Sequence, residues 1–313
     1  MAARRRRLLA SLAAGALSLC AGLTAEAAEY TFSTYGLGGT AFGAGVTPPP
    51  GTYVSAATTL YRGDITGNIN IGGVVFNAGA KAELLAGAVS GLYVPDWTVL
   101  GGRPGLSVTV PVGHIDLEAT ASVGPLSATR ETSGAGLGDV VSRLQLGWEH
   151  GDFAHLVWVQ AVAPTGRYDT GFFPIIGLHR PGIDTGWAFT WTDKQSKLQL
   201  NGAVGFNFNF ENDRTDFLSG NEVHFEWAVG YELMQGLVVG VVGYDWRQVT
   251  GDSGAGAVLG PFEGRVDAIG PGLSYTTVID KMPLIVNVRH YEEYNAERRI
   301  SGSMSIATVT LKF

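Results

Sequence analysis

Residues 301–313 read SGSMSIATVTLKF, and this stretch decides the fold class. From Ser305 on, the residues at odd positions become apolar and end on Phe313, while Thr308, Thr310 and Lys312 alternate with them. Alternation with a period of two predicts a β-strand whose two faces meet different environments. One face could meet lipid and the other water, or the strand could be an ordinary amphipathic strand of a soluble domain.

A strand that closes on a terminal aromatic residue resembles the C-terminal signal of bacterial outer-membrane β-barrels. That resemblance implies that Phe313 is an assembly signal and that the barrel-assembly machinery is a partner. The rest of the sequence is needed to distinguish an outer-membrane barrel from a soluble domain.

The composition favours a membrane barrel. The chain has 313 residues, of which 45% are hydrophobic and only 16% charged, and it holds 45 glycines. The body of the chain has no run of roughly 18–20 apolar residues, the length that a spanning helix needs. A barrel that faces lipid outside and water inside satisfies both observations, although a soluble β-rich enzyme remains an alternative. The net charge of −7 gives no reason to expect a nucleic-acid partner.

Residues 1–27 have the pattern of a cleaved secretory signal. Four arginines at 4–7 precede a run of small apolar residues, and Ala25-Glu26-Ala27 fits an A-x-A cleavage site. Cys20, the only cysteine, lies in this segment, so the mature chain would be free of cysteine, as an oxidising periplasm allows. The sequence therefore predicts export and, with outer-membrane lipid around it, residence in the bacterial outer membrane.

Residues 28–80 form the least regular part of the chain. They contain GLGGTAFGAG and the three prolines 48–50, which cannot lie in a central strand because each lacks the ladder donor. We predict that this segment is lumenal or periplasmic and that the barrel comprises residues 81–313. Residues 52–62 could form a strand, but one extra strand would make the number odd.

Alternating segments of about 9–14 residues follow, long enough to cross a bilayer at a tilt. The connections between them alternate in length: Gly113 and His114 form a short one, residues 124–138 a long one, and the pattern continues to the C-terminus. Long outer loops and short periplasmic turns are typical of outer-membrane barrels. We predict an all-β, antiparallel up-and-down barrel of about twelve strands, or fourteen if residues 30–44 and 52–62 also pair.

The polar faces of these strands are predicted to line the lumen, where charged groups could pair or form a constriction that sets selectivity. Two pairs are expected across neighbouring or nearby strands, Asp116 with Arg143 and Asp245 with Arg289. The predicted lumen residues are Asp116, Glu118, Arg143, Glu226, Asp245, Arg247 and Arg289.

Motifs that would indicate an enzyme are weak. Residues 251–254 read GDSG, as around a serine-protease nucleophile, but no segment supplies the His base in the expected context. Residues 134–138 read GAGLG without the Lys-Ser/Thr of a phosphate loop. The six histidines are scattered. We predict no catalytic residues, no cofactor and no metal site.

Several stretches together resemble the family named for the MetA pathway of phenol degradation. They are PPPGTY at 48–53, GLGD at 136–139, LGW at 146–148, PTGRYD at 164–169, GYDWRQVTGDSG at 243–254 and GRVDAIGPGLSY at 264–275. Each is short, but they occur in order over most of the chain. The resemblance implies an outer-membrane barrel that admits aromatic or other hydrophobic compounds, and it carries over no catalytic residue.

Three functional hypotheses follow. The leading one is a passive outer-membrane channel for small, partly hydrophobic or aromatic solutes. The second is a structural or adhesive barrel that transports nothing because its N-terminal segment fills the lumen. The third is a membrane-embedded hydrolase. A lumen with space lined by small and polar residues would favour the first hypothesis.

Overall fold

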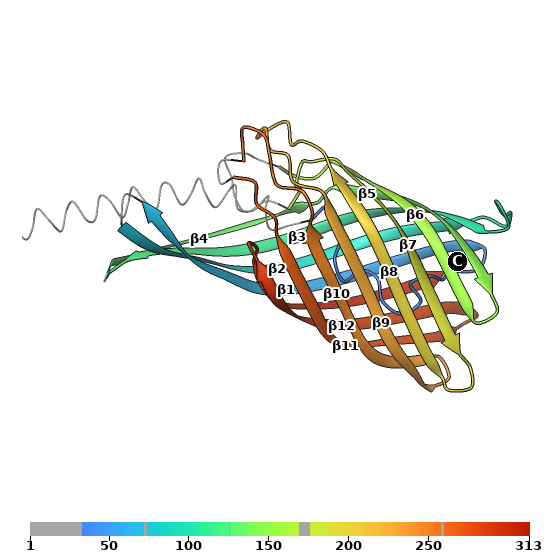
Figure 1. The fold of residues 1–313 in the computed structure, drawn as a ribbon. Coiled ribbons are helices and arrows are strands. Elements are labelled where there is room, and N and C mark those ends of the chain that lie inside the picture. Colours follow the sequence, from blue (N-terminus) through green and yellow to red (C-terminus); the bar gives the residue numbers. More distant parts are fainter. Residues whose placement is uncertain (1–32, 72–73, 125, 169–175, 258–259) are drawn as a thin grey trace, which may run out of the picture.

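The computed structural model describes residues 33–71, 74–124, 126–168, 176–257 and 260–313, so the predicted signal segment lies outside the described residues. Within these residues every regular element is a β-strand (Figure 1). The strands are β1 (Gly51–Ile71), β2 (Val74–Val94), β3 (Arg103–Val123), β4 (Leu126–Leu137), β5 (Val140–His150), β6 (Phe153–Ala163), β7 (Gly182–Asp193), β8 (Leu198–Asn209), β9 (Glu222–Met234), β10 (Leu237–Gln248), β11 (Arg265–Ile279), β12 (Met282–Glu297) and β13 (Ser301–Lys312).

These strands make a closed antiparallel barrel with twelve wall positions. β4 and β5 occupy one position together, because both pair with β3, and only Gly138 and Asp139 separate them. The barrel closes where β1 pairs with β13, from Tyr53 opposite Lys312 to Asp64 opposite Ser301. Closure leaves no open edge within the belt that faces lipid, which is the condition for a sheet to span a bilayer.

The predicted number of twelve strands is confirmed, but two assignments behind it are wrong and compensate each other. β1 begins at Gly51, directly after the three prolines, so the barrel does not start at residue 81. The predicted turn at Gly113 and His114 does not exist either, because β3 runs through it without a break. The predicted long loop at 124–138 is mostly strand β4.

An exposed apolar belt surrounds the barrel. On β3 the side chains of Leu106, Val108, Val110 and Val112 are all exposed, and the belt continues on the other strands through residues such as Val89, Val229 and Val309. Large apolar side chains around a closed barrel are the surface of a protein that spans a bilayer. The protein therefore lies in the bacterial outer membrane. Among the described residues, no helix is long and apolar enough to cross a membrane.

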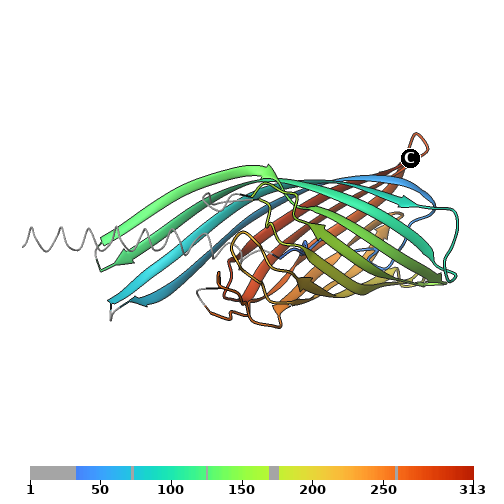
Figure 2. The ribbon, with the colours of Figure 1, turned by 90° about the horizontal axis from the view of Figure 1, so that it is seen from above.

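The first strands continue past this belt. β1, β2 and β3 each have 21 residues, whereas the strands β5 to β10 have 11 to 13. Figure 2 shows the blue to green strands projecting well beyond the rest of the barrel at one end. Arg62, Glu83 and Asp116 lie on consecutive strands at one level of this extension, and all three are exposed. The outward face becomes polar here because it has left the hydrocarbon region.

The two ends of the barrel differ in their connections. Two-residue turns join β5 to β6, β9 to β10 and β11 to β12 at one end, whereas residues 164–181, 210–221 and 249–264 form long loops at the other. The first residue of β1 and the last of β13 lie at the end with short turns. Long loops lie outside the cell in such barrels, so both the start of β1 and the C-terminal end of β13 face the periplasm.

The long loops bind one another over the outer mouth. Asn212 donates a side-chain hydrogen bond to Tyr168 Oη at 2.9 Å. Leu218 and Ser253 exchange backbone hydrogen bonds of 2.9 Å. The Asp252 carboxylate accepts the backbone N–H of Gly220 at 2.9 Å. The loops therefore form a joined cap rather than three independent loops.

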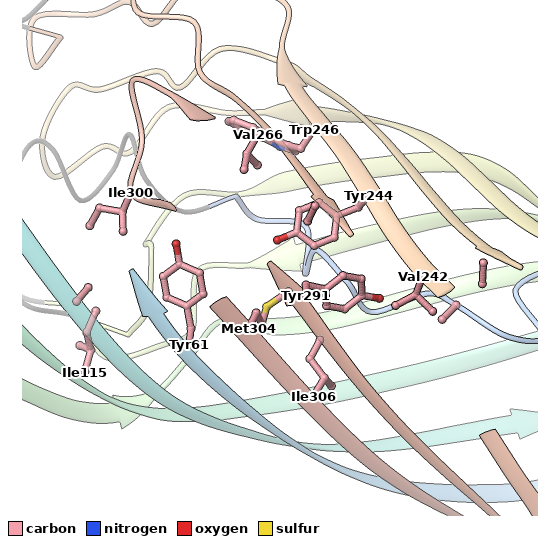
Figure 3. Close-up of a cluster of buried hydrophobic side chains, with 14 of the residues drawn as sticks. Tyr61, Ile115, Val242, Tyr244, Trp246, Val266, Tyr291, Ile300, Met304 and Ile306 are labelled. Carbon is pink, nitrogen blue, oxygen red and sulfur yellow. The ribbon is translucent and has the colours of Figure 1, made fainter. Parts of the chain in front are cut away.

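The largest buried apolar cluster lies inside the barrel and extends from β9 to β13 and on to β1, β2 and β3 (Figure 3). Tyr244 and Tyr291 pack with ring centroids 5.1 Å apart, and Met304 and Ile306 of β13 lie near them. These side chains fill part of the lumen, so the barrel is not an empty tube.

Candidate functional site

The segment 33–50 runs inside the barrel, and we call it the plug (Figure 1, blue coil). It reads STYGLGGTAFGAGVTPPP and carries no charged residue. Its first residue, Ser33, donates a hydrogen bond to Glu222 at the outer end of β9, and Pro49 accepts one from Tyr53 at the periplasmic start of β1. The plug thus extends through the lumen from the outer mouth to the periplasmic mouth.

A buried carboxylate holds the middle of the plug. Glu226 of β9 accepts the backbone N–H of Thr40 at 2.6 Å and that of Gly38 at 3.0 Å. Arg289 of β12 donates to the carbonyl oxygen of Gly39 at 2.8 Å. Hydrogen bonds to charged groups are the stronger ones, so these contacts fix the plug backbone firmly.

Uncharged side chains of the wall hold the plug nearer the periplasm. Asn201 Oδ1 accepts the N–H of Gly43 at 2.9 Å, and Thr190 Oγ1 accepts that of Gly45 at 3.0 Å. A Cβ atom on Gly45 would lie 2.5 Å from Phe189 Cα and 2.6 Å from the carbonyl oxygen of Ala154. Only a glycine lets the plug backbone come this close to the wall.

Aromatic stacking fixes the outer part of the plug. The Tyr35 ring stacks on His224 of β9, with centroids 3.5 Å apart and an interplanar angle of 17°. His224 Nε2 lies 2.8 Å from Asp184 Oδ2, and Trp158 Nε1 donates to the same carboxylate. Tyr35, His224 and Asp184 are not among the lumen residues predicted from the sequence. A signal was present in the alternation of Asp184 with Ile183 and Thr185, which indicates an inward position.

The plug lies against one side of the lumen only. On β7 to β10 most inward side chains are buried, for example Ala188, Asn201 and Val242. On β13, β1, β2, β3 and β5 most of the inward side chains are small or hydroxylated and only half-buried. They are Thr308, Thr310, Ser55, Ala57, Thr59, Ala86, Ala88, Ser90, Ser107, Thr109 and Val141, and we call the space in front of them the corridor.

The outer part of the corridor is an apolar cavity of about 380 Å³. Leu84, Ala86, Ala88, Ile115, Val162, Ile176 and Leu178 contribute most of its apolar lining, and the plug contributes Ser33, Thr34 and Gly36. Asp139 also borders the cavity, but its carboxylate accepts the backbone N–H groups of Gly166, Leu178 and His179. The cavity therefore offers an apolar space of the size of a small ring-containing molecule.

Hydroxyl groups dominate the corridor below this cavity. Ser90 Oγ lies 2.7 Å from Thr109 Oγ1, and Ser55 Oγ lies 2.7 Å from Thr310 Oγ1. Each hydroxyl is thus paired with its neighbour on the next strand and still has capacity for a further hydrogen bond. A solute would leave an apolar chamber and enter a lining rich in hydroxyl groups.

Three of the seven predicted lumen residues lie inside the barrel. Glu226 and Arg289 are buried against the plug, and Arg143 is half-buried, with its guanidinium carbon 4.6 Å from the centre of the Trp158 ring. That they set a constriction stays a prediction. The predicted inward position is wrong for the other four residues. Their strand register places them on the outer surface of the barrel: Asp116, Glu118, Asp245 and Arg247.

These four residues share one physical cause for their outward position. Along β3 the outward positions are apolar up to Val112 and polar from His114 on, because the strand leaves the bilayer there while its alternation continues. The inward positions become apolar instead, and Ile115 is buried in the lumen cluster. On β10 the inward positions at this end of the strand are likewise apolar, and Tyr244 and Trp246 are buried there.

The predicted pairs are therefore wrong as well. Asp116 has His114 as its neighbour, with Nε2 3.2 Å from Oδ1, and does not meet Arg143. Asp245 forms an ion pair of 2.9 Å with Arg247 on the outer surface and does not meet Arg289. Beyond the bilayer a polar residue can lie on either face of a strand, so polarity alone does not identify a lumen position there.

Phe313 follows the end of β13 and is 68% exposed. Its backbone N–H donates to the carbonyl oxygen of Thr52 at 2.8 Å, which extends the closing pair of strands by one residue. The side chain is available to a partner at the periplasmic end, and its role as an assembly signal stays a prediction.

The motifs that could indicate chemistry have structural roles. Ser253 of the GDSG stretch exchanges backbone hydrogen bonds with Leu218 in the outer cap. Residues 134–136 lie in strand β4 and not in a phosphate-binding loop. Among the residues that the structure describes, no group of three or more His, Cys, Asp or Glu side chains could hold a metal ion.

Comparisons with known proteins agree with this architecture. The family model described as "Putative MetA-pathway of phenol degradation" matches residues 63–307. The crystal structure of the COG4313 outer membrane channel from Pseudomonas putida F1 is similar at a TM-score of 0.66 and 13% identity, over 86% of this chain and 97% of that one. The transport unit of the autotransporter AIDA-I from Escherichia coli has a TM-score of 0.47 and 9% identity, over 93% and 96%. No curated protein sequence matched the chain.

Proposed function

The chain belongs to the family of the MetA pathway of phenol degradation, and from this premise we propose that it is a passive outer-membrane channel for small, partly hydrophobic solutes, aromatic compounds among them. The solutes pass through the corridor beside the plug. No catalytic step is part of this function. The similar structure from Pseudomonas putida F1 is itself that of an outer membrane channel, which is in keeping with the proposal.

The one-sided position of the plug is the observation that carries the proposal. If the plug filled the lumen evenly, the inward side chains of all strands would be buried alike. Instead, small inward side chains in the middle of β1 and β2, such as Ala57 and Ala88, stay half-buried, while those of β8 and β9 are mostly covered. A cavity of about 380 Å³ lies in the space that remains.

The lining supports the choice of solute. An apolar cavity favours the transfer of apolar surface out of water by roughly 25 cal/mol per Å². The paired hydroxyls below it offer hydrogen bonds without a strong charge. A small molecule with an apolar ring and one polar group fits an apolar cavity that is followed by paired hydroxyls. A sugar or a group of ions fits these linings less well.

Flux into liposomes tests the proposal. Purified protein should admit benzyl alcohol or benzamide and exclude solutes too large for the corridor. Ala88→Phe places a ring in the corridor and should reduce the flux several-fold. The matched control is Ala56→Phe, since Ala56 is the same residue type at an outward position on the neighbouring strand. Equal flux through both variants, or none through the unchanged protein, would contradict the proposal.

A barrel that transports nothing is the second candidate, and the number of hydrogen bonds between wall and plug favours it. Deletion of residues 33–49 distinguishes the two candidates. A channel with a side corridor conducts before the deletion and conducts more after it. A structural barrel is closed before the deletion, and only the truncated form conducts.

A further inference from the structure

The unpaired charges that a solute can meet in the corridor are positive. Arg143 and Lys312 both face inward on strands that line the corridor, and both are only half-buried. Among the residues that the structure describes, neither forms a hydrogen bond or an ion pair with its side chain: Arg143 lies over the Trp158 ring, and Lys312 Nζ is 5.6 Å from the centre of the Tyr53 ring. Each retains donors that an incoming acceptor could use.

The carboxylates inside the barrel are in the opposite situation. Glu222, Glu226 and Asp184 are each about 1% exposed and lie on the far side, behind the plug. Glu222 accepts hydrogen bonds from Trp246 and Asn209, and Glu226 accepts two from the plug backbone. Asp184 is bonded to His224 and Trp158. Their lone pairs are used, and their access to the corridor is blocked.

Three other inward acids near the corridor are bonded as well. Glu149, at the periplasmic end of β5, forms an ion pair with Arg103, with Oε2 2.6 Å from Nη2. Asp139 borders the apolar cavity but accepts three backbone N–H groups. Glu293 is bonded to the hydroxyls of Tyr61 and Tyr244 and to Arg299. The plug itself has no charged residue. Acids are therefore neutralised by fixed donors, while Arg143 and Lys312 are left to the solute.

Arg143 also has a favourable position relative to the cavity. Thr109, Val141 and Val162 form one row of paired residues that lines the cavity. Ser107, Arg143 and Gln160 form the next inward row toward the periplasm, two residues further along each strand. Two residues of a strand span about 6.6 Å, so the backbone of Arg143 lies one inward row from the lining of the cavity.

We propose that the corridor prefers anions and that its best solutes are small organic carboxylates, with the apolar body in the cavity and the carboxylate directed to Arg143 and then to Lys312. This preference presupposes the channel function proposed above. A guanidinium is suited to carboxylates because its fork of donors matches their two oxygens.

The reactivity of a single cysteine tests the proposal without requiring conduction. Ala88→Cys places a thiol in the corridor, and protein without the substitution gives the background. Two methanethiosulfonate reagents are compared, one with an anionic sulfonatoethyl group and one with a cationic trimethylammonioethyl group. The rate of each reagent with the protein is divided by its rate with a free thiol in solution. We expect the anionic reagent to be ~3-fold or more faster, as a positive local potential requires. Arg143→Gln should abolish the difference, whereas Arg62→Gln on the outer surface should leave it unchanged.

Flux measurements complete the test. Benzoate should enter liposomes faster than its neutral isostere benzamide, and Arg143→Gln should slow benzoate only. Equal normalised rates of the two reagents, a ratio that Arg143→Gln does not change, or a thiol that reacts with neither reagent would each overturn the anion preference. A different outcome would be no flux of any solute, with the anionic reagent still reacting faster than the cationic one. That result would reject the channel function, and the protein would then be a closed barrel with an electropositive cavity.

Discussion

The carboxylate of Glu226 accepts the backbone N–H of Thr40 at 2.6 Å, and this contact joins the wall to the middle of the plug. The same carboxylate accepts the N–H of Gly38 at 3.0 Å. Glu226 is about 1% exposed, so water cannot replace these bonds while the plug is in place. The pair of hydrogen bonds makes Glu226 the strongest single attachment of the plug among the described residues.

Glu226→Ala should therefore loosen the plug. The substitution leaves two buried N–H groups without an acceptor, at a cost of about 1–3 kcal/mol for each. We expect a higher single-channel conductance in planar bilayers and more frequent switching between levels. Glu292→Ala, which removes an exposed carboxylate from the outer face of β12, is the control and should conduct like the unchanged protein. Equal conductance of both variants would contradict the attachment.

The close approach of the plug to the wall gives a second prediction. Gly45→Ala places a Cβ atom within 2.6 Å of two backbone atoms of the wall, which cannot move aside as a flexible side chain can. The plug must shift, and we expect a change in conductance and faster proteolysis of the plug. Gly36→Ala is the matched control because its Cβ would meet nothing within 4 Å. The idea fails if the two variants behave alike.

Much of the wall could be predicted from the sequence, because alternation over 9–14 residues is a local property. On β9, for example, Glu226 is predicted to face the lumen, and the structure places it there. Residues 52–62 are left out of the predicted barrel because one extra strand would make the number odd, whereas in the structure they are part of β1. A local pattern does not show that such a strand closes the barrel against β13, since that contact joins distant parts of the chain.

The site was harder to predict than the wall. The sequence shows which residues alternate, but it does not show where a strand leaves the bilayer, and Asp116 and Asp245 were placed on the wrong face for that reason. The plug was expected in the lumen from its prolines and glycines. Its one-sided position depends on contacts such as Thr190 with Gly45, which join residues 145 positions apart. The corridor is therefore a property of the folded chain.

The orientation of the barrel can be checked by cysteine labelling. Asp213 in an outer loop and Lys194 in a turn at the opposite end have side chains that are 83% and 82% exposed, so they are a matched pair. We expect a membrane-impermeant maleimide to label Asp213→Cys on intact cells and Lys194→Cys only after the outer membrane is broken. Labelling in the reverse order would invert the topology.

The outer cap should depend on pH through Asp252. Burial raises the pKa of this carboxyl above its ordinary value, and Oδ2 has no partner among the described residues. Because the pKa is higher in the folded loop than in the open loop, the charged form is the costly one when folded. The cap should therefore be most stable below the ordinary pKa of Asp. Its stability should fall as the pH rises from that pKa to the raised pKa of Asp252, and it should not change further at higher pH.

Hydrogen exchange of the loop amides measures this effect. The N–H of Gly220, which donates to Asp252, should exchange more slowly at mildly acidic pH than at neutral pH, after correction for the intrinsic rate. Asp252→Asn keeps an oxygen for this N–H but cannot ionise, so its corrected protection should not vary with pH. Asp213→Asn removes a carboxyl that is 83% exposed, and it should retain the pH dependence of the unchanged protein. A pH dependence that persists in Asp252→Asn would assign the effect to another group.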